Sequence, residues 1–428
     1  MSSPLQTRGR GRVGVLRPLR NRDFALLWSG FTVSLLGDGI YIVAIAWQAF
    51  ELSNTPTALS VVGAAWTLPT VLLLLAGGVL SDRVDRRVLM MTADALRAVA
   101  IGAIGALSIA GVLELWELLV LVAVYGVGDA LFNPAASAIT PSLVPPEQLV
   151  EANALGYLVR PLALRFLGPA LGGVLVAGAG AGTCFVVDAG SFLVSAACIA
   201  AMRPRPVQPP PEPRRSVIAE IRDGMAFVRA TPWLWATLCS VGLALLAYYG
   251  PRQVLLPFRL KNDLGLGAGT FGAVLAAAGL GSMVAAVAIG QFGLPRRFIT
   301  WMYIAWALST LEVALFAFAG AVWQFMAIAV AGGLFETIGN VIWGTLMGSR
   351  VPTGLLGRVS SVDWQMSIAL TPISFGLAGP IAEGIGIRAT MIGAGVLGTL
   401  AVMAFLAVPG VRDPEREAGR TSSVPGPG

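Results

Sequence analysis

The 428-residue sequence contains no histidine and a single lysine, and only 12% of its residues are charged. The absence of histidine excludes a histidine proton relay and a zinc site with histidine ligands. Lys261 does not lie in a G-x-x-x-x-G-K-[ST] pattern, so the chain carries no ATP-binding P-loop of its own. Cys184, Cys198 and Cys239 lie inside apolar runs without metal-ligand spacing, and we expect buried free thiols. No metal or other cofactor is therefore expected.

Hydrophobic residues make up 56% of the chain, far more than in soluble proteins. Apolar runs of about 20 residues recur along the whole length, which predicts an all-α, multi-pass membrane protein. We expect twelve spans, at residues 24–50, 58–80, 88–111, 117–140, 154–178, 182–202, 233–257, 268–291, 299–319, 322–348, 362–382 and 389–408. The net charge of +6 comes from cations in the loops, which favours contact with anionic lipid and no nucleic-acid partner.

The cations are distributed very unevenly between the two sets of loops. With the N-terminus inside, 22 of the 29 cations lie in cytoplasmic loops and tails, and three lie in outer loops. The remaining four lie in or at the ends of spans. Since cytoplasmic loops are enriched in Lys and Arg, both termini are predicted to be cytoplasmic. The high ratio of arginine to lysine suggests a GC-rich bacterial genome, and hence the inner (plasma) membrane of a bacterium.

A proline-rich segment divides the chain into two halves of six spans. Residues 203–215 contain six prolines, which predicts a stiff, extended linker. Residues 216–230 place Val217, Ile221, Met225 and Val228 on one face, which predicts an amphipathic helix on the inner membrane surface. The expected units are a cytoplasmic arm (1–23), a six-helix half (24–202), the linker with its helix (203–232), a second half (233–408) and a disordered cytoplasmic tail (409–428).

The two halves resemble copies of each other. Arg86-Arg87 before the third span is echoed by Arg296-Arg297 before the ninth, 210 positions later. The segment 143–149 before the fifth span is echoed by 350–356 before the eleventh, 207 positions later. Because each half has an even number of spans, both copies have the same orientation. This is a parallel repeat about an axis along the membrane normal.

The loop between the second and third spans reads Gly78-Val-Leu-Ser-Asp82-Arg83-Val-Asp85-Arg86-Arg87. It resembles the loop 2–3 signature of the major facilitator superfamily, G-x-L-a-D-r-x-G-r-k, with Asp85 where many members have glycine. The variant looks like the drug-exporter branch that includes macrolide and siderophore proton antiporters. The resemblance implies that the acid at Asp82 contacts the start of helix 11 and helps to close the cytoplasmic side. The alternative is a basic loop that serves only topology, with its charges paired to each other or to neighbouring helix ends.

The fifth span contains Gly168-Pro169-Ala-Leu-Gly172, which resembles the core of the antiporter motif of the family, G-P-x-x-G. Leu164 stands where the longer motif has glycine, so the match is partial. The resemblance implies export by exchange. The alternative is a kink that serves helix packing alone, because proline frees a backbone carbonyl and glycine allows close approach.

Three acidic residues are predicted near the middle of spans: Asp38 in the first, Asp129 in the fourth and Glu336 in the tenth. In the family fold, spans one, four, seven and ten line the central cavity. Charges at this depth usually face a cavity or a partner, because each costs about 3 kcal/mol at the bilayer centre. A carboxyl group removed from water is more easily protonated. Each acid could therefore carry a proton, bind a cationic substrate, or alternate between the two.

Polar neighbours extend these positions along their helices. Tyr125 and Asn133 lie four residues on either side of Asp129, and Asn340 and Trp343 continue the face of Glu336. Tyr248 and Tyr249 would face inward from the seventh span. Asp38 lies in Leu36-Gly-Asp-Gly-Ile, which looks like the first-span pattern of the drug-exporter branch, whereas Val122 replaces the arginine usual in the fourth span.

The alternative for each acid is neutralisation by an arginine. Arg165 in the fifth span and Arg160 before it are candidate partners for Asp38 or Asp129. Asp94 and Arg97, three residues apart in the third span, are expected to form a structural pair that supports the loop 2–3 latch (Gly78, Asp82, Arg83, Arg86, Arg87). Asp188 and Glu312 lie on spans that the family places at the periphery, and neither is assigned a role.

We expect a non-enzymatic secondary transporter, active as a monomer, that exports amphipathic or cationic small molecules in exchange for protons by alternating access. The proton gradient would be its energy source. An importer or a lipid flippase of the same fold is the alternative within transport. A membrane receptor would typically carry a signalling domain, and a membrane enzyme would need polar residues at a membrane surface, whereas those found here concentrate at the midplane.

Overall fold

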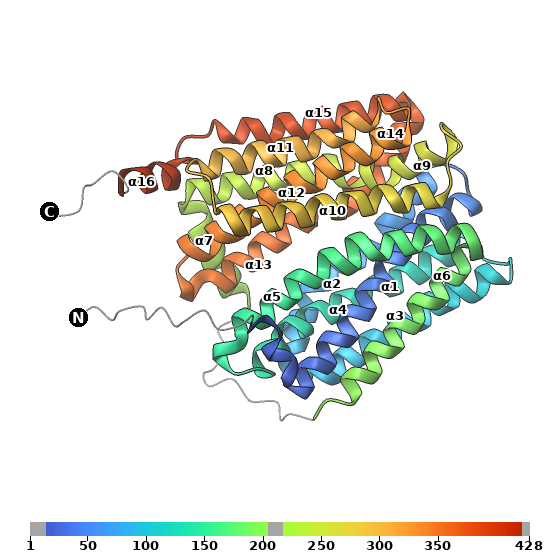
Figure 1. Ribbon diagram of the computed structural model, residues 1–428, viewed down its shortest axis with the longest axis horizontal. Helices are drawn as coiled ribbons and strands as arrows, with labels where there is room; N and C mark the ends of the chain where they lie inside the picture. Colours follow the sequence, from blue (N-terminus) through green and yellow to red (C-terminus); the bar gives the residue numbers. More distant parts are fainter. Residues whose placement is uncertain (1–13, 204–216, 422–428) are drawn as a thin grey trace.

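The computed structural model describes residues 14–203 and 217–421, and every element in these ranges is a helix (Figure 1). The first half consists of η1 (Gly14–Arg20), α1 (Arg22–Leu52), α2 (Pro56–Arg83), α3 (Arg86–Ile109), α4 (Leu115–Ile139), η2 (Thr140–Ser142), η3 (Pro146–Gln148), α5 (Leu149–Val159), η4 (Arg160–Leu167) and α6 (Gly168–Ala200). The second half consists of α7 (Val217–Ala230), α8 (Pro232–Gly250), η5 (Pro251–Leu255), α9 (Leu256–Asn262), α10 (Ala268–Phe292), α11 (Phe298–Phe316), α12 (Val322–Arg350), α13 (Thr353–Ala369), α14 (Thr371–Ile385), α15 (Ile387–Leu406) and α16 (Asp413–Thr421).

Eleven helical stretches among the described residues are long and apolar enough to cross a membrane, and one of them passes through it twice. This stretch, Pro146–Ala200, is broken at Gly180, whose φ of 79° is open to glycine but strained for other residues. Before the break, α6 runs parallel to α1, with Gly168 against Gly39 and Gly172 against Ile40. After the break it runs antiparallel. The chain therefore reverses at Gly180, which gives the twelve predicted spans.

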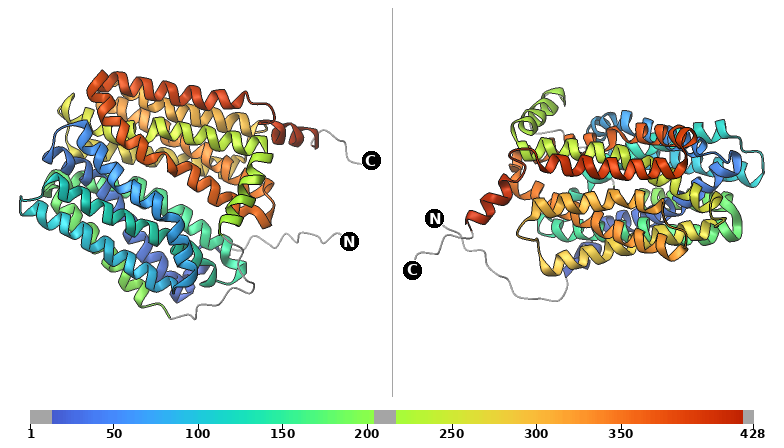
Figure 2. Two further views of the ribbon diagram at one scale, coloured as in Figure 1. Left: turned by 180° about the vertical axis from the view of Figure 1, so that it is seen from behind. Right: turned by 90° about the horizontal axis from the view of Figure 1, so that it is seen from above.

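The two halves lie side by side as separate helical layers (Figure 1), and both views of Figure 2 place α7 and α16 at the same end of the molecule. We call this the α7–α16 end. At the opposite end the halves meet along α2 with α14, where Gly379 N donates to Ser60 Oγ at 2.7 Å and Thr57 N donates to Glu383 at 3.2 Å. Asn54 also donates to Asn262 Oδ1 across the halves at 2.6 Å. The opposite end is therefore closed.

A second seam between the halves joins α6 to α10 through glycine. Gly272 lies against the carbonyl of Pro169, and Gly173 lies against Gly269, so that a side chain at Gly272 or Gly173 would overlap the facing backbone. Glycine at these positions lets the two backbones touch. These contacts also lie toward the opposite end, where Trp47 stacks on Phe271 with ring centroids 6.1 Å apart.

Two of the described spans contain a π-helical segment, and each segment begins with a proline as its first or second residue. η4 follows Val159 and contains Pro161, and η5 begins at Pro251. Proline has no N–H to donate and crowds the preceding turn, so the regular hydrogen-bond ladder is interrupted there. Each segment carries an arginine that pairs with a glutamate of the second half, Arg165 in η4 and Arg252 in η5.

The predicted linker helix is present as α7, whereas the tail departs in part from the prediction. α7 packs on α13, with Gly224 against the backbone of Arg358 and Asp223 paired with the Arg358 guanidinium at 3.3 Å. Val228, which was predicted for the membrane surface, is buried in the second half. The tail predicted to be disordered forms α16 over its first part. Glu415 accepts hydrogen bonds from Thr300 at the start of α11, and Glu417 pairs with Arg350 at 2.7 Å.

Candidate functional site: charged clusters inside the two halves

Four aspartates of the first half lie close together inside the membrane-spanning helices. We call Asp38, Asp94, Asp129 and Asp188 the acid cluster. Arg97 on α3 forms ion pairs with Asp94 on its own helix and with Asp129 on α4, the latter at 3.2 Å. Its guanidinium lies over the rings of Phe132 and Phe192, 4.3 and 4.4 Å from their centroids. Arg97 is 3% exposed, so both ion pairs are largely shielded from water.

The partners of the other two aspartates are neutral hydroxyl groups. The Tyr125 hydroxyl donates to Asp38 Oδ1 at 2.9 Å, and the Ser191 hydroxyl donates to Asp188 Oδ1 at 3.2 Å. Asp129 accepts a further hydrogen bond from Trp66 Nε1 at 3.0 Å. The aromatic rings around these groups are in mutual contact; they are Tyr41, Trp66, Tyr125, Phe185 and Phe192. The rings thus cover much of the acid cluster, while Asp38 and Asp129 stay partly accessible.

The second half contributes two ion pairs, and one of them joins the halves. Arg165 Nη1 on η4 lies 2.8 Å from Glu336 Oε1 on α12, with side-chain exposures of 45% and 24%. We call this pair the arginine bridge. Arg252 on η5 lies 3.5 Å from Glu312 on α11, whose other oxygen accepts from the Tyr248 hydroxyl at 3.3 Å. Here each acid has a cationic partner.

The structure corrects two partner assignments and adds two residues. Arg165 pairs with Glu336 rather than with Asp38 or Asp129, and Asp129 pairs with Arg97. The predicted Asp94–Arg97 pair is present, but Arg97 reaches into the acid cluster instead of serving only the loop. Asp188 and Glu312, which were given no role, both have contacts within these clusters. Their spans are not among the four that the family fold places around the cavity. Gly37 on α1 leaves room for Asp188, and Gly332 on α12 leaves room for Glu312, so both side chains reach the clusters.

The residues of the predicted polar stripes each have a hydrogen-bond or ring partner. Asn133 donates to the backbone carbonyl of Asp129 on its own helix at 3.0 Å. Asn340 accepts from Trp306 Nε1 at 3.1 Å, and Trp343 donates to Asp363 at 3.2 Å. Tyr249 packs on Tyr248 with centroids 5.9 Å apart. Asn133 and Asn340 are exposed on the protein, so other side chains do not enclose their amide groups.

The loop between α2 and α3 ties helix ends of its own half together. Arg86 donates to the carbonyl of Ala138 at 2.9 Å, and Arg87 donates to those of Ile199 and Ala200 at 3.2 and 3.0 Å. Cations at helix C-termini are favourable, because unpaired carbonyls point outward there. Asp85 caps α3 by accepting from the amide of Arg87. The side chain of Asp82 lies outside the described part of the chain. Arg358 on α13, near the start of the eleventh span, pairs with Asp223.

The glycines of the fifth span lie at contacts with both halves. Gly168 touches α1 at Gly39, Gly172 touches α1 at Ile40, and the carbonyl of Pro169 faces Gly272 of α10. The motif therefore has a packing function in this conformation, at the seam between the halves. Its part in exchange stays a prediction.

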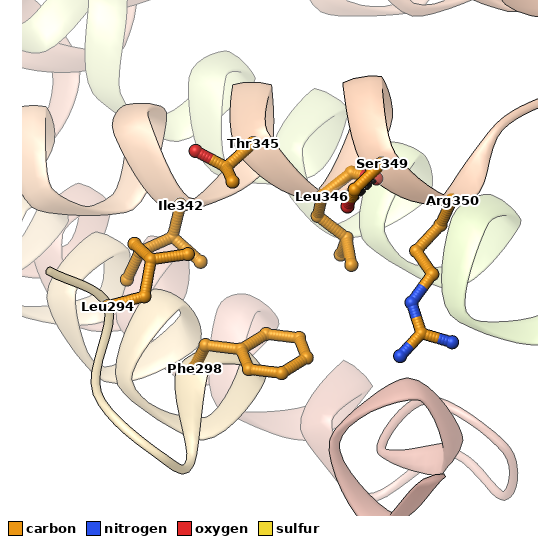
Figure 3. Close-up of a pocket in the computed structure, with 7 residues that line it drawn as sticks. All are labelled: Leu294, Phe298, Ile342, Thr345, Leu346, Ser349 and Arg350. Atoms are coloured by element: carbon orange, nitrogen blue, oxygen red, sulfur yellow. Dashed lines mark hydrogen bonds between the residues drawn. The ribbon is translucent and has the colours of Figure 1, made fainter. Parts of the chain in front are cut away.

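A shallow pocket at the α7–α16 end lies apart from these clusters (Figure 3). It opens between α12 and the start of α11, where Ile342, Leu346 and Phe298 face one another and Arg350 closes one side. None of the predicted site residues lines it. Within the described residues, no group of three or more His, Cys, Asp or Glu could hold a metal ion.

Comparison with known proteins decides the family. Residues 13–426 match the model of the family described as transmembrane secretion effector. The chain belongs to this family of the major facilitator superfamily. This transporter is 30% identical over 393 residues to the multidrug efflux pump Tap of Mycolicibacterium fortuitum, covering 86% of the chain and 90% of the relative. It is 24% identical over 379 residues to macrolide efflux protein A of Streptococcus pyogenes, covering 87% and 93%.

Solved structures show the same fold for this major facilitator protein. The nucleoside transporter NupG superposes with a TM-score of 0.67 at 10% identity, covering 88% of this chain and 98% of the other. A bacterial homologue of the iron transporter ferroportin, in an inward-facing state, superposes with a TM-score of 0.64 at 19% identity, covering 90% and 99%. The protein is thus a multi-pass membrane transporter and not an enzyme, as the sequence predicted.

Proposed function

We propose that this transporter exports amphipathic, cationic small molecules in exchange for protons, with the α7–α16 end in the cytoplasm. The uneven distribution of loop cations supports this orientation. The closed opposite end then corresponds to the outer side, and the conformation is inward-facing. The printed names of the relatives, multidrug efflux pump and macrolide efflux protein, support export of drug-like substrates.

The observation that carries proton coupling is the unequal charge of the two clusters. In the second half, Glu312 and Glu336 each face an arginine. In the first half, Arg97 contacts two aspartates while Asp38 is held by a hydroxyl. Unpaired carboxylates are costly at this depth, and protonation removes that cost. The acid cluster is therefore the part of the molecule suited to taking up and releasing protons.

The arginine bridge supports a cationic substrate. Glu336 is partly exposed and holds Arg165 of the other half at 2.8 Å. A cation that entered between the halves would compete with Arg165 for this carboxylate. Its binding would weaken the contact between η4 and α12, so the substrate itself would favour separation of the halves on the closed side. Protonation of the acid cluster from outside would then reset the transporter.

Drug accumulation in cells that lack their own pumps tests this function. The probes are ethidium, a permanent cation, and erythromycin, measured with and without the transporter and before and after a proton uncoupler. We expect lower ethidium accumulation that the uncoupler reverses. Higher accumulation would favour the importer alternative, and lower accumulation unaffected by the uncoupler would argue against proton coupling.

Substitution of Asp38 separates coupling from folding. Asp38→Asn keeps the size of the side chain and the acceptor for Tyr125 but cannot release a proton. We expect loss of uncoupler-sensitive efflux at unchanged membrane abundance. Glu147→Gln is the matched control, because Glu147 is an exposed acid in the loop before α5, and its removal should leave efflux intact. Proton-driven efflux by the Asp38→Asn protein would contradict the assignment.

A further inference from the structure

Asp188 and Asp94 are the two fully buried acids of the acid cluster, and of the two only Asp188 has no ion pair with Arg97. Its side chain is 0% exposed, and it lies on the second pass of α6 against Gly37, one residue before Asp38 on α1. Ser191 donates to one carboxyl oxygen at 3.2 Å, and the other oxygen, Oδ2, has no hydrogen-bond partner. Glycine at position 37 is needed for this approach, because any side chain there would overlap both Asp188 and Ser191.

The charged and titratable groups around Asp188 come from four helices. Asp38 and Tyr41 face it from α1, Arg97 from α3, and Asp129 and Tyr125 from α4, while Cys184 lies one turn away on α6 itself. Arg160 on η4 acts on Asp38 and Asp129. Arg97 makes its ion pairs with Asp94 and Asp129, which leaves Asp188 with a hydroxyl donor.

A carboxylate in this position would carry a full charge with one oxygen unsatisfied. An unpaired buried ion is far more costly than a neutral carboxylic acid, whose hydroxyl can donate a hydrogen bond. A negative charge on Asp38 adds repulsion across the α1–α6 contact. Ionisation of both acids at once would therefore be costly, so the two compete for protons.

We propose that Asp188 is a proton-carrying residue of the transport cycle and exchanges its proton with Asp38. The O–H bond at one carboxyl group breaks as the O–H bond at the other forms, and the single negative charge moves from the acceptor to the donor. The proposal rests on the proposed proton coupling and extends it to a helix outside the cavity-lining set. Gly37 is the residue that lets Asp188 pack against α1 directly beside Asp38.

Infrared difference spectroscopy of the purified full-length protein tests the protonation state without a substrate. We expect the carbonyl band of a protonated carboxylic acid in the wild-type protein at neutral pH, its loss in Asp188→Asn, and a decrease of the band as the pH is raised. Absence of a difference between the two proteins would overturn the proposal, because Asp188 would then be ionised. A band that persists at every pH would also overturn it, because Asp188 would never release its proton.

Transport in proteoliposomes tests the part played by that proton. Asp188→Asn should lose pH-gradient-driven ethidium transport, Asp188→Glu should retain part of it, and the exposed-loop control Glu147→Gln should transport at the wild-type rate. Driven transport by Asp188→Asn at the wild-type rate would overturn the proposal, whereas a wild-type protein indifferent to the pH gradient would instead contradict the proposed function. If Asp188→Asn does not fold, Ser191→Ala takes its place in the infrared experiment. Loss of the 3.2 Å hydrogen bond should then shift the Asp188 band, and an unchanged spectrum would overturn the proposal.

Discussion

Removal of the arginine bridge should shift the equilibrium between the two conformations of the transporter. In Glu336→Gln, Arg165 loses a carboxylate 2.8 Å away on the other half. At an effective dielectric constant of about 20, this contact corresponds to about 6 kcal/mol of Coulomb energy. Arg165 is 45% exposed, so water screens most of that energy, and the net contribution is about 1 kcal/mol. The population closed at the opposite end should fall about fivefold relative to the open one.

Distances between spin labels at Glu147→Cys and Arg222→Cys would report this shift, since both positions are exposed on different halves. The labels would be placed in a protein without its three native cysteines. Glu312→Gln is the matched control, because it removes a glutamate from a pair whose partner, Arg252, belongs to the same half. We expect a redistribution of distances for Glu336→Gln and none for Glu312→Gln. The same distribution in both variants would refute the argument that the bridge holds the halves together.

Two further substitutions test the packing of the clusters and of the seam. Arg97→Gln leaves Asp94 and Asp129 without their buried cation and should destabilise the protein by about 3–5 kcal/mol. Thermal unfolding in detergent should show this loss, with partial recovery in Arg97→Gln/Asp129→Asn. An unchanged melting temperature would contradict the pairing. Gly272→Val should force α10 away from Pro169 and open the end opposite the α7–α16 end. A cysteine introduced at Asn54 should then react faster with a polar thiol reagent. Gly290→Val on the same helix meets open space and is its control.

The architecture could be predicted because the bilayer imposes a simple pattern. Spans must be long and apolar, and loop cations report their orientation, so the twelve spans and the two halves follow from composition along the chain. The sequence also identified the reversal between the fifth and sixth spans as a gap at 179–181, where the structure places Gly180.

The charge pairs could not be predicted, because they depend on which faces of distant helices meet. The predicted spans place Arg165, Asp38 and Asp129 at similar depths in the membrane. Arg165 nevertheless faces α12 and pairs with Glu336. Asp188 was placed at the periphery by the order of the spans, and only the contact with Gly37 reveals its position. The glycines that face other helices carry this information, but a single sequence does not show which helix each one faces.

The π segments η4 and η5 make the charge pairs depend on the number of residues in a helix as well as on their identity. Each residue turns a helix by about 100°, so deletion of one residue near Pro161 or Pro251 would restore a regular turn and rotate Arg165 or Arg252 away from its acid. Such a deletion would keep every charged side chain and still separate the pairs. Insertions and deletions in these two short segments are thus a route by which related transporters could change their coupling without exchanging a single polar residue.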